Sequence, residues 1–95
     1  PELEARRRAQ ILDVAAREFA RYGFANTQVQ TIADHVGVGN GTIFRYFPTK
    51  EKLFLEAVRR GLEELTVEMD RVLDLPRDPV DQLVAAIRTY LEFFH

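Results

Sequence analysis

The chain has 95 residues, of which 46% are hydrophobic and 29% charged, as in an ordinary globular domain. It contains no cysteine, which excludes disulfide frameworks, cysteine-ligated zinc and thiol nucleophiles. The net charge of −2 conceals an asymmetry, because residues 1–52 carry +2 and residues 53–95 carry −4. The first half of the chain is therefore the part whose charge permits a nucleic-acid partner.

Membrane and export signals are absent from the printed sequence. No apolar run reaches the length of a membrane span, and no charged-then-apolar leader precedes the first helix. We therefore expect a cytoplasmic protein with no membrane partner.

The first predicted element is an amphipathic helix over residues 3–22. Its apolar face repeats at helical spacing and consists of Leu12, Ala15, Ala16 and Phe19. Gly23 is expected to end this helix, because glycine readily takes the left-handed conformation that follows a helix end.

A run of three arginines, Arg6, Arg7 and Arg8, leads into this helix. Either the run is a solvated helix start, or it is an arm that contacts a phosphate backbone. We favour the solvated interpretation, because three charges make only a small cluster.

Two short helices are predicted next, joined by a tight turn. The first follows Thr27, whose hydroxyl is expected to cap its first turn. Its apolar repeat is Val29, Ile32, Ala33 and Val36. Gly37 permits the positive φ of a sharp turn, and the second short helix covers residues 42–47 before Pro48.

Two longer helices follow. Thr49 is expected to cap a helix that runs to about Leu73, and residues 75–79 are expected to break it. A further apolar repeat runs from Val80 to Phe94 and meets no stop signal. We therefore expect this last helix to be cut within a larger helical domain.

The spacing within residues 27–47 is that of a helix-turn-helix. Ala33 is small where two helices cross closely, and Val38 and Ile43 are apolar where both helices must seat on the first one. In such a motif the second helix places its N-terminal residues against base edges in the major groove. These features alone leave DNA binding and a purely structural use equally open.

The sequence resembles the TetR family of bacterial transcriptional regulators over roughly residues 6–55. The residues that carry the resemblance are Ile11-Leu12, Ala15-Ala16, Phe19, Tyr22-Gly23-Phe24, Thr27, Ile32-Ala33, Gly37-Val38, Gly41-Thr42-Ile43-Phe44-Arg45-Tyr46-Phe47 and Lys50-Glu51-Lys52-Leu53. The resemblance implies an all-α fold with a three-helix helix-turn-helix DNA-binding domain at residues 1–48. Residues 49–95 are then a connector helix and the truncated start of a helical effector-binding and dimerisation domain.

The resemblance also implies a function. A TetR-like regulator binds double-stranded DNA at a palindromic operator as a homodimer when full length. It is usually a repressor, which an as yet unknown small-molecule effector releases from the operator. We expect no enzymatic activity, no cofactor and no metal ion.

The family's DNA contacts transfer to positions in three segments of this chain. They are Thr27, Gln28, Gln30, Gly39, Asn40, Gly41, Thr42, Phe44, Arg45, Tyr46 and Lys50. By resemblance, Thr27 and Gln28 lie where the family contacts phosphate, and Gln30 lies where a base is often read. Residues 39–46 span the recognition helix and its entry, and Lys50 meets phosphate.

Two positions depart from the family pattern. Gly39 stands where serine is common, so we expect Asn40 to take over as the helix cap. Phe44 stands where tyrosine is common, and it either packs beside Ile43 and Phe47 or touches DNA. Phe47 is expected in the core, while Tyr46 is expected to rest its ring on the protein and offer its hydroxyl to phosphate.

The competing hypothesis is a helical protein-interaction module that reuses the fold without binding DNA. An enzyme is disfavoured, because no nucleophile, base or paired-carboxylate arrangement stands out in the sequence. His35 has no second ligand three or four residues away, which disfavours a metal site. Salt separates the first two hypotheses, because only DNA binding releases counterions.

Overall fold

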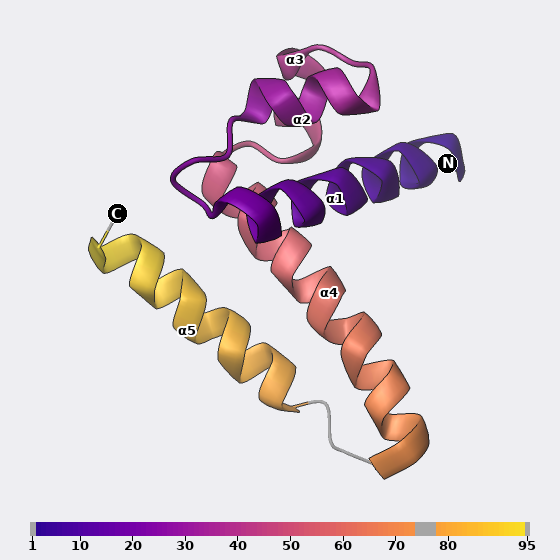
Figure 1. The fold of residues 1–95 in the computed structure, drawn as a ribbon, viewed down its shortest axis with the longest axis vertical. Coiled ribbons are helices and arrows are strands. Elements are labelled where there is room, and N and C mark those ends of the chain that lie inside the picture. Colours follow the sequence, from indigo (N-terminus) through magenta and orange to yellow (C-terminus); the bar gives the residue numbers. More distant parts are fainter. Residues whose placement is uncertain (1, 74–77, 95) are drawn as a thin grey trace. The chain divides into compact units, whose positions relative to one another are not determined.

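The computed structural model describes residues 2–73 and 78–94, with side chains through residue 65, at 67 and over 80–93. These residues form five helices and no strand, which confirms the all-α prediction (Figure 1). The helices are α1 (Glu2–Tyr22), α2 (Val29–Val36), α3 (Asn40–Tyr46), α4 (Lys50–Leu73) and α5 (Asp78–Phe94). The chain divides into two compact units at residues 57 and 58, whereas the domain boundary expected after residue 48 stays a prediction.

The first helix, α1, supplies the apolar stripe on which the first unit is built. Its buried residues are Ile11, Leu12, Ala15 and Phe19, so Ile11 joins the expected stripe. Gly23 follows the helix at φ +82°, and its N–H donates to the carbonyl of Phe19 at 2.8 Å. The helix therefore ends at the expected glycine.

The turn between α2 and α3 depends on Gly37, which adopts φ +88°. The N–H groups of Gly37 and Val38 both donate to the carbonyl of Ala33, at 2.8 and 3.0 Å. This double hydrogen bond ends α2 abruptly and returns the chain so that α3 packs on α2, which itself packs on α1 (Figure 1). The predicted helix-turn-helix is therefore present.

Buried side chains then seat α3 and the start of α4. Ile43 and Phe47 are fully buried, as is Leu53 in the first turn of α4. Phe47 is extended, at φ −135° and ψ 98°, as the residue before a proline must be. Thr49 accepts a hydrogen bond from the N–H of Lys52 at 3.0 Å, which confirms it as the cap of α4.

An aromatic cluster joins the end of α1 to α4 within the first unit. The rings of Phe19 and Phe54 meet edge to face at 4.9 Å between centroids, and those of Phe24 and Phe54 at 5.2 Å. Such edge-to-face pairs add to the stability of the fold beyond the contribution of the apolar area that they bury.

The second unit contains the rest of α4 and α5. α5 begins at Asp78, so the expected break at residues 75–79 is wrong for its last two positions, while residues 75–77 lie outside the described ones. Proline is tolerated in a first turn because its missing N–H needs no partner there, which suits Pro79. Within this unit Arg59 donates to a carboxylate oxygen of Asp81 at 2.6 Å.

Gly37→Ala is expected to lower the free energy of unfolding by about 1–2 kcal/mol, because an L side chain is strained at positive φ. A Cβ at this position has open space around it, so the cost is in the backbone alone. Urea unfolding measures the change. Gly61→Ala is the control, since Gly61 is an exposed residue inside α4 where alanine should stabilise the helix. Equal stability of Gly37→Ala and the wild type would contradict the strain.

Candidate nucleic-acid interface

The candidate DNA-contacting residues all fall in the first unit, at the start of α2, along α3 and at the start of α4. Those with exposed side chains or backbone are Gln28, Gln30, Gly39, Gly41, Phe44 and Arg45. Those that are half-buried are Asn40, Thr42, Tyr46 and Lys50. Only Thr27 among them is buried.

Thr27 is part of the internal architecture. Its side chain is 2% exposed, and its hydroxyl lies 2.8 Å from the carbonyl oxygen of Gly23 and 3.1 Å from that of Glu18. The prediction that Thr27 caps the second helix is wrong, because Gln28 occupies the cap position and makes no side-chain cap bond. The Thr27 hydroxyl instead satisfies carbonyl groups around the end of α1. Any contact between Thr27 and DNA therefore goes through its backbone.

The start of α2 presents free backbone donors and two glutamines. Because the Gln28 side chain makes no cap bond, the first N–H groups of α2 lack the acceptor that a capping residue would supply. Such a helix end attracts anions. Gln30 is exposed, and its Nε2 donates to a carboxylate oxygen of Asp34 at 2.8 Å. This bond fixes the amide of Gln30 and leaves its oxygen for another donor.

The start of α3 differs from the sequence-based expectation. Gly39, in extended conformation at ψ 165°, is the cap residue, and its carbonyl accepts from the N–H of Thr42 at 3.1 Å. Asn40 therefore lies inside the first turn, and the prediction that it caps the helix is wrong. Its Oδ1 is buried and has no hydrogen-bond partner among the described residues. A cap side chain must stand one position earlier to reach the N–H groups of that turn.

The outward face of α3 is formed by Gly41, Phe44 and Arg45. Phe44 is 40% exposed although Ile43 beside it is fully buried, because successive helical residues point about 100° apart. Phe44 is therefore outside the buried core that contains Ile43 and Phe47, and the exposed part of its ring is open to a partner. Gly41, one turn earlier, has open space where a Cβ would stand.

Two cations at this surface rest on aromatic rings. The Arg45 guanidinium carbon lies 5.3 Å from the ring centroid of Tyr46, and the Nζ of Lys50 lies 4.5 Å from that of Phe24. Within the described ranges, no carboxylate forms an ion pair with either cation. A cation–π contact orients a charge without neutralising it. Both charges therefore stay available to an anionic partner.

The three arginines at the start of α1 have three different surroundings. Arg6 pairs with Glu2 at 3.6 Å, and both side chains are exposed to solvent. Arg8 pairs with Glu56 at 3.2 Å and places its guanidinium carbon 5.0 Å from the ring centroid of Phe47. Sequence reasoning treated the run as one cluster, because nothing in the local spacing connects Arg8 to Glu56, which lies 48 positions further along the chain.

Arg7 has the third kind of surroundings. It lines a shallow hollow between the start of α1 and the end of α3, together with Leu3, Glu4, Arg45 and Tyr46. Sequence reasoning missed this position, because only the fold brings residue 7 beside residues 45 and 46.

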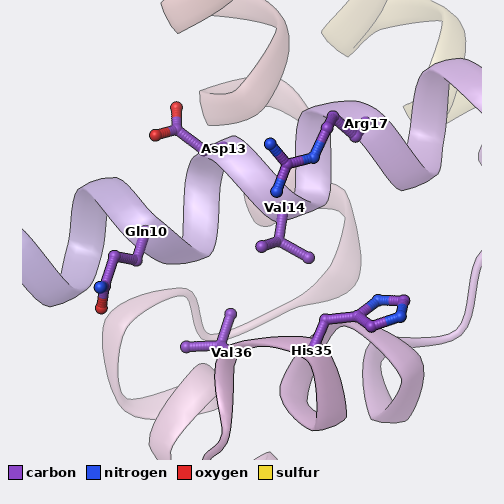
Figure 2. Close-up of a pocket in the computed structure, with 6 residues that line it drawn as sticks. All are labelled: Gln10, Asp13, Val14, Arg17, His35 and Val36. Atoms are coloured by element: carbon purple, nitrogen blue, oxygen red, sulfur yellow. The ribbon is translucent and has the colours of Figure 1, made fainter.

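A second hollow lies between α1 and α2, and Figure 2 shows Val14 and Val36 pointing toward one another across it. Its lining residues are Gln10, Asp13, Val14, Arg17, His35 and Val36. Because acidic, basic and apolar side chains all line this hollow, its lining does not indicate one class of ligand. Across the described residues, no three metal-ligating side chains gather at one place. None of the described helices has the length and apolar character needed to cross a bilayer.

Comparison with known proteins agrees with this geometry. Residues 11–57 match the family described as bacterial regulatory proteins, tetR family. The chain is 32% identical over 92 residues to the HTH-type transcriptional repressor KstR2 of Mycolicibacterium smegmatis, covering 97% of this chain and 45% of that protein. No solved structure matches the chain significantly.

Two further relatives extend the pattern to other regulators. The HTH-type transcriptional repressor Rv1474c of Mycobacterium tuberculosis is 37% identical over 67 residues, which cover 70% of this chain and 36% of that protein. The uncharacterized HTH-type transcriptional regulator YhgD of Bacillus subtilis is 33% identical over 88 residues, covering 92% of this chain and 46% of that protein. The chain spans less than half the length of these relatives. Its helix-turn-helix unit, with the matching residues 11–57, belongs to the tetR family of bacterial regulatory proteins.

Proposed function

We propose that this chain is the DNA-binding part of a cytoplasmic, non-enzymatic repressor that binds a palindromic operator as a homodimer when full length. A small-molecule effector releases it from the operator. The observation that carries the proposal is the outward face of α3, which is held in place by a buried core. On this face Arg45 forms no ion pair among the described residues and lies over the Tyr46 ring, and the ring of Phe44 is exposed. The relatives named as transcriptional repressors support the same function.

The side chains on this surface divide by chemistry. Lys50, the start of α2 and the Tyr46 hydroxyl suit phosphate, because they offer positive charge or hydrogen-bond donors. Arg45 and Gln30 suit base edges, because arginine pairs with guanine and glutamine with adenine in the major groove. Gly41 lets the backbone of α3 approach the DNA, since no side chain stands between them.

The second unit supports the effector and dimer parts of the proposal. α5 exposes Leu83, Tyr90 and Phe93, although its Val84 is buried. Exposed apolar residues of this kind suit a surface that another helix covers. In the proposed full-length protein, α4 transmits the effector's presence to the DNA-binding unit, because α4 belongs to both units.

The experiment that tests the proposal is selection of operators from a random duplex library, followed by titration of a selected and a scrambled duplex. We expect tighter binding to the selected duplex and a steep loss of affinity with salt. Equal binding to both duplexes, or binding that salt leaves unchanged, would favour the protein-interaction module instead.

Lys50→Ala is expected to weaken binding to all duplexes similarly and to reduce the salt slope of log K by about 0.9, the share of one phosphate contact. Fluorescence anisotropy at several salt concentrations measures the slope. Lys52→Ala is the matched control, because Lys52 lies on the same turn of α4 about 200° around the axis. A slope that Lys50→Ala leaves unchanged, or that Lys52→Ala reduces as much, would refute the contact.

Arg45→Ala is expected to change the order of preferred operator sequences, with a loss of about 1–3 kcal/mol of discrimination at one base pair. Repeating the library selection with the variant measures the order. Arg17→Ala serves as control, since Arg17 lies in the hollow between α1 and α2. An unchanged order would assign Arg45 to phosphate or to the protein surface.

Phe44 offers only apolar contact, and the apolar group of the major groove is the 5-methyl of thymine. Replacing the contacted thymine by uracil is expected to weaken wild-type binding about fourfold, the worth of one buried methyl group. In Phe44→Ala the same replacement should have no effect, because the ring is gone. Scanning uracil along the selected half-site finds the position. If Phe44→Ala still preferred thymine over uracil at that position, Phe44 would not be the residue that contacts the thymine methyl group.

A further inference from the structure

The run of arginines at the start of α1 contains one guanidinium that the fold leaves for a ligand. Arg6 is paired with Glu2, and Arg8 is held between Glu56 and the ring of Phe47. Among the described residues, Arg7 forms no ion pair and stacks on no ring. It is nevertheless half-buried, because it lies in the hollow beside the end of α3.

The hollow gathers two like charges. Arg7 and Arg45 both line it, and Glu4, which also lines it, forms no ion pair with either guanidinium within the described part of the chain. Two guanidinium groups around one hollow repel each other until an anion is placed between them. Tyr46 also lines the hollow, and its hydroxyl is a neutral group that can donate a hydrogen bond. This donor set suits an oxygen-rich anion.

We propose that Arg7 and Tyr46 bind one backbone phosphate of the DNA, next to the base that Arg45 reads. The inference rests on the proposed function and adds a residue that the family resemblance did not supply. A phosphodiester has the oxygen acceptors that a guanidinium fork binds best, and its single negative charge relieves the repulsion between Arg7 and Arg45.

The Arg7 contact is separate from that of Lys50. Arg7 lies near the start of α1, whereas Lys50 rests on Phe24, just after the end of the same helix. Positions 7 and 22 of α1 are separated by fifteen helical steps, or about 22 Å, which exceeds the spacing of neighbouring phosphates on one strand. The two cations therefore bind different phosphates, and their contributions to the salt slope should add.

The test uses adjacent arginines as matched controls. Arg7→Ala is expected to lower the salt slope by about 0.9, so that the affinity ratio of wild type to variant shrinks three- to fourfold between about 50 and 200 mM salt. It should leave the order of preferred operators unchanged. Arg6→Ala should keep the wild-type slope, and the double variant of Arg7→Ala with Lys50→Ala should lose about 1.8. Arg7→Lys should restore most of the slope, because it keeps the charge.

Several outcomes would overturn the proposal. Equal salt slopes for Arg7→Ala and wild type would show that Arg7 contacts no phosphate. Equal losses of slope in Arg6→Ala and Arg7→Ala would show only a general effect of charge. Thermal unfolding by circular dichroism checks that each variant is folded, and Arg7→Gln replaces Arg7→Ala if the alanine variant is unstable. If the wild type itself shows no salt-dependent DNA binding, the proposed function fails, and that result is distinct from a failure of Arg7 alone.

Discussion

The short helices α2 and α3 depend on burial against α1. They have eight and seven residues, well below the length at which an isolated helix is stable in water. Their shape is maintained because Ile32, Ala33 and Ile43 are fully buried in the core that α1 supplies. The position of every candidate DNA contact therefore follows from an apolar core that touches no DNA itself.

This core also explains how charge is presented at the surface. Arg8 pairs with Glu56 at the surface and lies over the ring of Phe47, and these contacts connect α1 to the start of α4. Lys50 and Arg45 instead rest on aromatic rings, which orient them and leave their charges uncompensated. A chain with a net charge of −2 can thus present a locally positive face to an anionic polymer.

The sequence was sufficient to predict the elements, because helical periodicity and stop signals are local. Gly23, Gly37 and Thr49 end or begin helices where expected, since each acts through its own backbone conformation or its own hydroxyl. The caps at Thr27 and Asn40 were misplaced, because a cap depends on where the first helical φ and ψ fall, and a shift of one residue reassigns it.

The contacts between residues that are distant along the chain could not be predicted from local sequence patterns. Two of the three arginines owe their surroundings to residues 38 to 48 positions away along the chain, because Arg7 lines a hollow with Arg45 and Arg8 pairs with Glu56. The exposure of Phe44 follows from the rotation of a helix that only the burial of Ile43 and Phe47 fixes. The resemblance to the family was enough to identify the residues of the candidate site. Only the structure shows which of them are buried, as Thr27 is, and which are exposed.

The central claim is that the helix-turn-helix unit, and not the exposed apolar surface of α5, meets the partner. Amide chemical-shift mapping by NMR with a selected operator duplex tests it most directly. The account predicts that shifts concentrate at the start of α2, along Asn40–Tyr46 and at Lys50, while residues 80–93 stay unchanged. Shifts centred on α5 with an unperturbed α3 would contradict it.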